Sequence, residues 1–166
     1  PRDSAFERHV GGTYTLFYRH GSPLSNFHPS RFEDEHGMVF SCSEQYYQHR
    51  KALHYGDHAA ASAIARATDP GYMKRLGRTV DRFADDRRRW MAGEAEGTMR
   101  TGLRLFAQNR HLAEHLMKRT RVIIAEASPT DTYFGIGVGL YSAEAAAPSE
   151  WRGANVLGKL LMEIIL

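Results

Sequence analysis

The sequence predicts a compact α+β fold that is rich in helix and has a small, mostly antiparallel sheet. Apolar residues follow helical spacing in the middle of the chain, as at Met99, Leu103 and Phe106. Short β-branched and aromatic runs occur near the N-terminus and again late in the sequence. The chain has 166 residues, 42% hydrophobic and 25% charged, which favours one domain with a real core.

Each element is expected from a local pattern. Strands are predicted at 13–18 and 121–125, and a hairpin at 31–42 with its turn at 34–37. Ser43 is the expected N-cap of a helix over 45–54, and Asp57 and Asp69 precede two further helix starts. The remaining helices are expected at 81–109 with a break at Gly93 or Gly97, at 111–119 and at 155–166, and 143–149 is expected to be an exposed loop.

Composition limits the class of protein. A single cysteine, Cys42, cannot form an intramolecular disulfide, which favours a reducing, cytoplasmic compartment (or the nucleus, if the source is eukaryotic). A buried structural role for Cys42 is favoured over a nucleophilic one. No apolar run reaches the roughly 20 residues of a membrane span, and residues 1–9 do not resemble a signal peptide.

The charge pattern favours phosphate-bearing partners and no metal. The formal net charge is +3, and this mild basic excess suits a nucleotide or a nucleic acid. The run Arg87 to Arg89 is more typical of a solvated helix face than of a nucleic-acid site. His111 and His115 have zincin-like spacing but no glutamate directly after the first histidine. We therefore expect no metal site and no cofactor.

The segment Ser-Glu-Gln-Tyr-Tyr-Gln-His-Arg-Lys at 43–51 is the most informative. On a helix Glu44, Tyr47, Gln48 and Lys51 share one face. Such a stripe suits a site that binds a polyol and moves protons. Spacing alone favours the other interpretation, an exposed face with a ladder of ion pairs.

A glycine-rich segment late in the chain is a second candidate. Gly135 and Gly137 allow the backbone to approach a ligand closely, although a simple turn is the commoner explanation. The segment lacks the strand–glycine loop–helix setting of a dinucleotide fold. Asp131, just before it, could be a turn residue by itself.

Several motifs together extend these observations over the whole chain. They include Pro-Leu-Ser-Asn-Phe at 23–27, Ser-Glu-Gln-Tyr-Tyr-Gln at 43–48 with Lys51, Phe-Ala-Gln-Asn at 106–109 and Gly-Ile-Gly at 135–137. Further matches lie at 69–70, Lys74, 77–78, Trp90, Met99, 126–131 and 151–158. In the order and spacing of these motifs the sequence resembles the NADAR family, also called YbiA-like or RibX-like. The resemblance spans roughly residues 14–166, so 1–12 is expected to be an N-terminal extension and 13–166 the domain.

The resemblance implies a small α+β N-glycosidase. Some members act on an N-ribosyl intermediate of riboflavin synthesis, and others remove ADP-ribose from guanine in DNA. By position, Glu44 matches the essential glutamate of the family and Lys51 its helix lysine, and Asp131 is grouped with these two as catalytic. The expected substrate-binding residues are Arg19, Asn26, Phe27, Tyr47, Gln48, Phe134, Gly135, Gly137 and Asn155.

Two departures from the family pattern bear on the substrate. Phe134 stands where the family usually has tryptophan before Gly-Ile-Gly, so a ring for stacking remains but the indole N–H donor is lost. Leu105 stands where a lysine is frequent.

Three functions follow as alternatives. Removal of ADP-ribose from guanine in DNA is favoured, and the riboflavin-type glycosidase is the main rival. A non-catalytic ADP-ribose-binding module is the third, against which the retained Glu44 and Lys51 argue. In the catalytic versions Glu44 stabilises the sugar cation or transfers a proton. Lys51 either orients a phosphate or hydroxyl, or attacks the sugar C1 as an amine.

Overall fold

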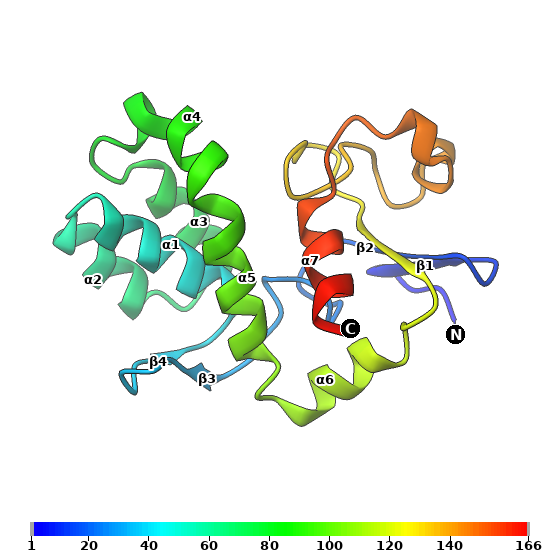
Figure 1. Cartoon of the computed structure of the whole chain (residues 1–166), viewed down its shortest axis with the longest axis horizontal. Coiled ribbons are helices and arrows are strands. Elements are labelled where there is room, and N and C mark those ends of the chain that lie inside the picture. The colour runs from blue at the N-terminus through cyan, green and yellow to red at the C-terminus, as the bar shows by residue number, and fades with distance from the viewer. Residues whose placement is uncertain (1, 166) are drawn as a thin grey trace. The chain divides into compact units, whose positions relative to one another are not determined.

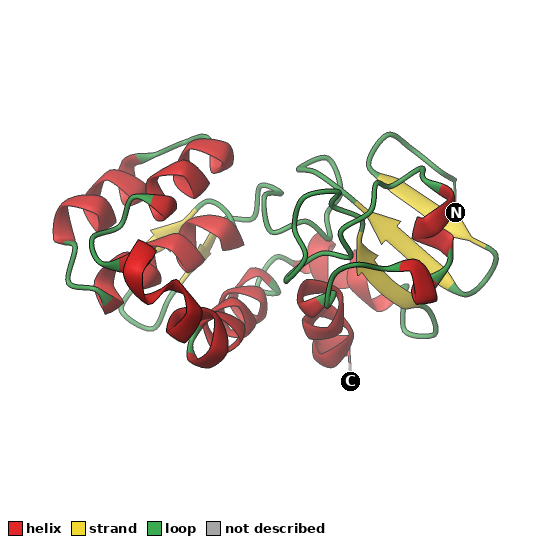
Figure 2. Cartoon of the chain, turned by 90° about the horizontal axis from the view of Figure 1, so that it is seen from above, coloured by secondary structure: helices red, strands yellow, loops and turns green. Residues whose placement is uncertain are grey.

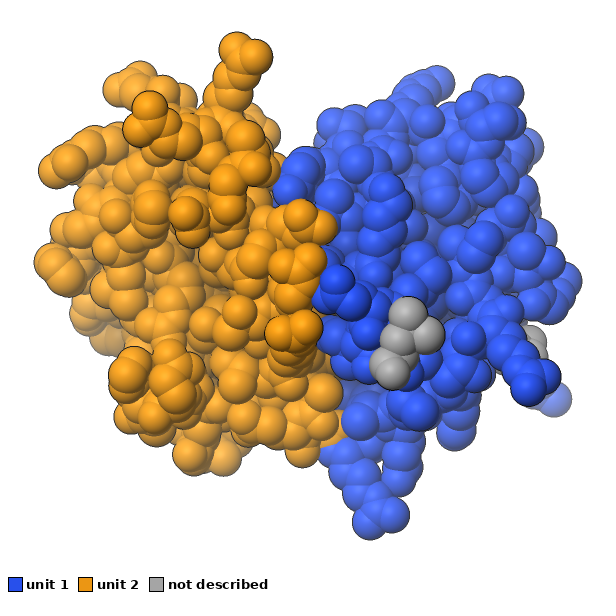
Figure 3. Space-filling view, viewed as in Figure 1, with its two compact units in different colours: residues 1–28, 110–166 blue, residues 29–109 orange. Residues whose placement is uncertain are grey.

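The computed structural model describes residues 2–165, which divide into two units (Figure 3). The first unit combines the segments Pro1–His28 and Arg110–Leu166, and the second is the continuous stretch Pro29–Asn109. Strands β1, β2 and β5 belong to the first unit, and the short pair β3–β4 with five helices belongs to the second. The predicted α+β class, with helices outweighing strands, is confirmed.

A three-stranded sheet in the order β1-β2-β5 organises the first unit (Figure 2). Strand β1 (Glu7–Val10) pairs antiparallel with β2 (Tyr14–Phe17). Strand β5 (Ile123–Glu126) pairs with β2 in parallel, with Tyr14 opposite Ile123 and Phe17 opposite Glu126. Parallel neighbours need a long crossover connection, and here that connection includes the whole second unit.

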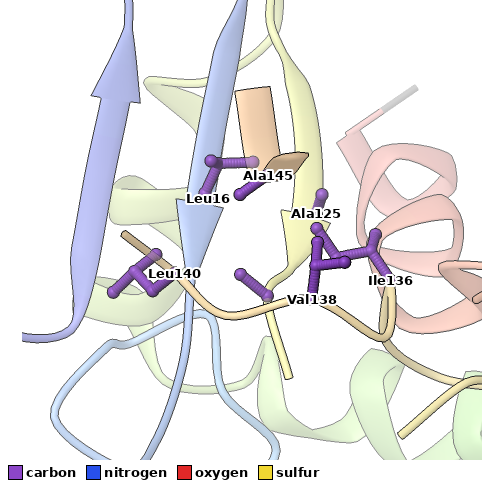
Figure 4. Packing of buried hydrophobic residues seen from close by; sticks show 7 residues of the cluster. Leu16, Ala125, Ile136, Val138, Leu140 and Ala145 are labelled. Atoms are coloured by element: carbon purple, nitrogen blue, oxygen red, sulfur yellow. The ribbon is translucent and has the colours of Figure 1, made fainter. Parts of the chain in front are cut away.

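Small and aliphatic side chains fill the core on one side of this sheet (Figure 4). Leu16 of β2 and Ala125 of β5 meet residues of the loop that follows β5. The buried members of this cluster are Leu16, Ala125, Ala127, Ile136, Val138, Leu140 and Ala145. Their burial fixes the path of the loop at 127–142, which carries several of the predicted substrate residues.

Helices complete the first unit. Helix α6 (Arg110–Met117) and helix α7 (Val156–Ile165) contact each other, and α7 packs on β5 (Figure 1). Residues 143–149 differ from the predicted exposed loop. They form two short 3₁₀ turns, Ala143–Ala146 and Pro148–Glu150, and the Ala145 side chain is 0% exposed. A methyl group is small enough to enter the core from a tight turn, and in an alanine-rich run the sequence does not show which alanine is buried.

Helix α1 (Ser43–His54) is the centre of the second unit. Helices α2 (His58–Arg66), α3 (Pro70–Arg78) and α5 (Ala95–Phe106) all pack on it. Helix α4 (Phe83–Gly93) packs on α5, and the predicted break falls at Gly93. The predicted core stripe of α5 is confirmed, because Met99, Leu103 and Phe106 are buried.

The start of α1 differs from the prediction. Cys42 is the N-cap and Ser43 is already helical, so the expected Ser43 cap is wrong. Instead Gln45 Oε1 reaches back and accepts hydrogen bonds from the backbone N–H of Ser41 at 2.8 Å and from its hydroxyl at 3.2 Å. This contact resembles the second half of a capping box, except that the bonded N–H lies one residue before the N-cap. The Asp57 and Asp69 caps of α2 and α3 are as predicted.

A hairpin precedes α1. Strands β3 (Phe32–Glu33) and β4 (Val39–Phe40) pair antiparallel across the turn predicted at 34–37. Phe32 and Phe40 stack on each other, and Tyr46 of α1 packs against Phe32 at a tilt and against Phe40 edge to face. Among the described residues, no helix has the length and apolar character needed to cross a bilayer.

Candidate functional site

The polar stripe of α1 lies in the interior of the protein. Glu44 and Lys51 are each 3% exposed and Gln48 is 4% exposed, and Tyr47 is buried beside them. The interpretation as an exposed ladder of ion pairs is therefore wrong. Burying a carboxylate, an amide and an amine is unfavourable unless they are paired or functional, so their burial marks the stripe as a candidate site.

Gln48 links Glu44 to helix α3. The Gln48 amide donates a hydrogen bond of 2.7 Å to Glu44 Oε1. Its own Oε1 has no hydrogen-bond partner within residues 2–165. Gly77 of α3 lies against this amide so closely that a Cβ at position 77 would overlap Gln48 Oε1. Gly77 therefore leaves room for Gln48, and Gln48 in turn orients the Glu44 carboxylate.

Lys51 has a perturbed amine. Its Nζ lies 3.7 Å from the centre of the Phe83 ring and 5.8 Å from that of Tyr47. Burial lowers the pKa of Lys51 to about 8, against the opposing effect of Glu44 and with help from the positive charges of Arg87, Arg78 and Lys74. At pH 7 this pKa leaves about a tenth of the amine neutral, far more than in an ordinary lysine, and an attacking amine must be neutral.

Aromatic side chains support the other side of the stripe. The Trp90 indole N–H donates a hydrogen bond of 2.8 Å to the Tyr47 hydroxyl, and the two rings pack edge to face. Trp90 is also buried against His54 and Tyr55. The Tyr47 phenol is thereby fixed in direction, and its hydroxyl hydrogen can serve a further acceptor.

The loop that follows β5 is organised by Asp131. Its Oδ1 accepts hydrogen bonds from the backbone N–H groups of Tyr133 at 2.9 Å, Phe134 at 2.8 Å and Gly135 at 3.4 Å. These contacts give Asp131 the role of a turn residue. A catalytic role for Asp131 stays a prediction.

The glycines of this loop permit tight packing. A Cβ at Gly135 would meet the carbonyl oxygens of Asp131 and Glu126, and Gly137 has a φ of +73°. Phe134 is half-buried, and its ring packs edge to face on Tyr133 with 4.8 Å between the ring centres. The half-buried ring of Phe134 is compatible with the predicted stacking role.

The Asn155 side chain forms hydrogen bonds with the backbone of strand β5. Its Oδ1 accepts from the Glu126 N–H at 3.1 Å, and its Nδ2 donates to the Ile124 carbonyl at 3.0 Å. With a φ of +53°, it is one of the few non-glycine residues in the left-handed region. The structure thus gives both polar atoms of Asn155 a structural use, and its predicted contact with substrate stays a prediction.

The predicted residues of the N-terminal turn lie in the first unit. Arg19 is exposed, has a φ of +70° and lies over the Tyr18 ring. Asn26 is buried and Phe27 is half-buried. The turn is held by Ser22, whose hydroxyl donates a hydrogen bond of 2.7 Å to the buried carboxylate of Glu7.

Glu7 was not identified from the sequence. Its carboxylate also accepts from His115 at 2.9 Å and from Arg119 at 2.9 Å. Hydrogen bonds from His115 and Ser22 and the charge of Arg119 outweigh the effect of burial and lower the pKa of Glu7 to about 2. His115 and Arg119 are one helical turn apart, but Glu7 and Ser22 lie far from them in the sequence, so only the fold reveals the cluster.

Other sequence interpretations also have an outcome. Cys42 is buried, and burial raises its pKa to about 11, which suits an inert thiol. His115 contacts Glu7 instead of forming a site with His111, and in the described part of the chain no three His, Cys, Asp or Glu side chains gather as metal ligands. Arg87, Arg88 and Arg89 are exposed, as expected of a solvated helix face.

A shallow hollow over α6 contains none of the predicted residues and is lined by Arg110, Ala113, Glu114, Met117 and Lys118.

The fold and the buried stripe define the class of protein. Residues 16–165 match the NADAR domain model, and the chain belongs to the NADAR family. The fold is similar to that of the Escherichia coli protein YbiA, with a TM-score of 0.69 and 24% identity over 97% of this chain and 88% of that one.

Curated relatives come from distant organisms. Protein irg-1 of Caenorhabditis elegans is 33% identical over 91% of this chain and 77% of its own length. An N-glycosidase of Acanthamoeba polyphaga mimivirus is 31% identical over 85% of this chain and 84% of its own length. The riboflavin biosynthesis protein PYRR of Zea mays is 27% identical over 99% of this chain, which corresponds to 26% of that longer protein.

Proposed function

We propose that this protein hydrolyses the N-glycosidic bond between a ribose and a base, and that its substrate is guanine in DNA that carries ADP-ribose. The observation that carries the proposal is the buried set of Glu44, Gln48 and Lys51 on one face of α1. Family membership and the relatives named N-glycosidases support the reaction class. The basic character of the chain, with a pI near 9.2, suits a substrate rich in phosphate.

Glu44 is assigned the chemistry on the sugar side. Breaking the bond from C1 to the base nitrogen builds positive charge on the ribose, which a carboxylate stabilises. The hydrogen bond from Gln48 fixes the direction of the Glu44 carboxylate, which is assigned to face the sugar or an attacking water. The leaving base takes a proton as the bond breaks.

Lys51 is assigned a nucleophilic role. Its neutral amine forms a bond to C1 as the bond to the base nitrogen breaks, and the sugar ring opens to an imine on Lys51. Water then releases the sugar and regenerates the amine. The lowered pKa of Lys51 supports this version, because more of the amine is neutral at pH 7 than in an ordinary lysine.

The riboflavin-type glycosidase is the second candidate. The maize riboflavin biosynthesis protein aligns with 99% of this chain and supports this alternative. Its substrate would be a small N-ribosyl phosphate. A DNA substrate and a small metabolite are separated by assaying the same protein on both.

The central test replaces Glu44. Glu44→Gln is expected to lower release of ADP-ribose from modified guanine in an oligonucleotide by at least about 100-fold, in line with loss of a catalytic carboxylate. Calorimetry with free ADP-ribose should show binding within a few fold of the parent protein. Glu33→Gln, an exposed carboxylate of the same unit, is the control. Normal turnover by Glu44→Gln would refute the assignment, and binding without any turnover by the parent protein would indicate an ADP-ribose-binding module.

A second experiment tests Lys51. Borohydride added during turnover is expected to reduce the imine and leave a stable sugar adduct on Lys51, located by peptide mass spectrometry. Turnover without such an adduct would exclude the covalent route while leaving the role of Glu44 intact.

A further inference from the structure

Two arginines from different helices border the polar stripe of α1. Arg78 is the last residue of α3, one position after Gly77, which packs on Gln48, and its charge is among those that act on Lys51. Arg87 lies four residues after Phe83 and three before Trp90, so the three share a face of α4. Phe83 contacts Lys51 and Trp90 contacts Tyr47, which places this face of α4 against the stripe.

Three of the neighbouring arginines have an acidic partner, whereas Arg78, Arg87 and Arg88 have none within 4.0 Å in residues 2–165. Residues 70–89 include seven basic and three acidic side chains. Arg75 pairs with Asp69 at 4.0 Å, Arg82 with Asp81 at 3.9 Å and Arg89 with Asp86 at 3.8 Å. In residues 2–165 neither Arg78 nor Arg87 has an acidic partner within 4.0 Å, and both are exposed.

Their charge reaches the stripe. The positive charges of Arg87 and Arg78, together with that of Lys74, are among the causes that lower the pKa of Lys51. Two guanidinium groups without carboxylate partners beside a buried amine make this part of the surface favourable for an anion. Guanidinium groups match the geometry of phosphate oxygens, to which they donate paired hydrogen bonds.

We propose that Arg78 and Arg87 form a phosphate-binding edge beside the α1 stripe and hold the phosphates of the substrate. The inference rests on the proposed function, because that substrate has two sources of phosphate. One is the diphosphate of the ADP-ribose group, and the other is the backbone of the DNA that carries it. Both present the same chemistry to a pair of arginines, and two binding measurements separate them.

The experiment measures binding in a Glu44→Gln background, where the substrate is not consumed. Arg78→Gln and Arg87→Gln are compared with Arg88→Gln, which removes the same charge from α4 one position along and so from a different face. Dissociation constants are measured for free ADP-ribose, for an unmodified oligonucleotide and for the same oligonucleotide with ADP-ribosylated guanine, each at several salt concentrations.

Arg78→Gln and Arg87→Gln are each expected to weaken binding of the modified oligonucleotide by about tenfold, as loss of a hydrogen bond to a charged group implies. The slope of log affinity against log salt should also fall by about one. An equal loss with free ADP-ribose assigns the edge to the diphosphate. A loss confined to the two oligonucleotides assigns it to the DNA backbone. Arg88→Gln should leave all three affinities within about twofold.

The proposal is overturned if Arg78→Gln and Arg87→Gln bind all three ligands as Arg88→Gln does. That result leaves the proposed function intact, provided that the Glu44→Gln protein itself binds ADP-ribose or the modified oligonucleotide. If the background protein binds neither, the proposed function fails before the arginines are compared. Circular dichroism of each variant confirms that the helices are retained.

Discussion

At the scale of single residues, the proposed site depends on a glycine that carries no chemistry. Gly77 leaves the space that the Gln48 amide occupies, and Gln48 holds Glu44 by a hydrogen bond of 2.7 Å. Gly77 is therefore a positioning residue for the carboxylate. Its effect passes through Gln48, and a substitution at position 77 should alter catalysis without touching substrate.

Gly77→Ala is expected to displace Gln48 and release Glu44 from its hydrogen bond. The free energy of unfolding should fall by about 1–3 kcal/mol, as for other overpacked sites. The turnover number should fall by about tenfold or more at a temperature where the variant is fully folded, because a small misplacement of a catalytic group is costly. Both quantities come from chemical denaturation and steady-state kinetics.

Gly97→Ala provides the matched control for this substitution. Gly97 also lies in a helix, and a Cβ there would meet nothing within 4 Å. The change should stabilise the protein by about 0.4–1 kcal/mol and leave turnover unchanged. Gly77→Ala together with Gln48→Ala should recover stability, since the clash is then absent. Unchanged kinetics in Gly77→Ala alone would contradict the positioning role.

The sequence predicted the composition of this site better than its environment. Spacing placed Glu44, Gln48 and Lys51 on one face, and the structure agrees. The burial of these side chains was not predictable, because a stripe of polar and charged residues is usually exposed unless other helices cover it. Phe83 and Gly77 contact the stripe from α4 and α3, at separations for which the sequence holds no local signal.

At the scale of elements, one side chain docks α7 on the sheet. The Asn155 side chain uses both its oxygen and its nitrogen in hydrogen bonds to the backbone of β5. Gly158 has no side chain, and this lets helix α7 approach the Ile124 carbonyl closely. The sequence predicted this helix and its start, and grouped Asn155 with the substrate residues. Its contacts across 29 and 31 positions of the chain could be known only from the fold.

Asn155→Ala is expected to lower the free energy of unfolding by about 2–4 kcal/mol. The substitution removes the hydrogen-bond partner of the Glu126 N–H and of the Ile124 carbonyl, and each buried group left unpaired costs about 1–3 kcal/mol. Alanine is also strained at the positive φ of this position. Urea denaturation gives the value. Lys159→Ala, exposed on the same helix, should change it by less than about 0.5 kcal/mol. A drop in substrate affinity with unchanged stability would instead favour the predicted binding role.

Strand β1 is the element that the sequence analysis missed. Residues 1–12 were expected to be an extension, yet Glu7–Val10 pairs with β2 along its whole length. Gly11 and Gly12 lie between the two strands and are typical of a hairpin turn. This glycine pair was the feature of the sequence that could have indicated β1. The charged and polar run Glu-Arg-His obscured it, because an edge strand needs few apolar residues.

At the scale of the whole molecule, the Glu7 cluster joins parts of the chain that are far apart in sequence. Glu7 lies on β1, and Ser22 lies in the turn that carries Asn26. His115 lies near the end of α6, and Arg119 lies just beyond that helix. Its pKa in the folded protein is lowered from 4.5 to about 2. A lowered carboxyl pKa means that the cluster stabilises the fold fully above about pH 4.5 and loses that effect as the pH falls toward 2.

Glu7→Gln is expected to lower the free energy of unfolding at pH 7 by roughly 2–3 kcal/mol. The parent protein should lose stability between pH 4.5 and 2 more steeply than the variant, because only the parent has this carboxylate to protonate. Urea denaturation at pH 7, 4 and 3 measures both effects. Glu35→Gln, with its side chain 64% exposed, should retain the parent profile. Parallel pH profiles for Glu7→Gln and the parent would contradict the assigned role of Glu7.

The parallel pairing of β2 with β5 has a consequence for how the chain acquires its structure. Tyr14 meets Ile123, so the central strand lacks this neighbour until 109 further residues have been synthesised. The second unit, in contrast, is formed by the single uninterrupted segment 29–109, so all of its helices are synthesised one after another. During translation this stretch can form first, while β1 and β2 wait as a two-stranded hairpin, which is marginally stable in water. Closure of the sheet by β5 is then the late step in folding, and substitutions in β5 should speed unfolding more than they slow folding.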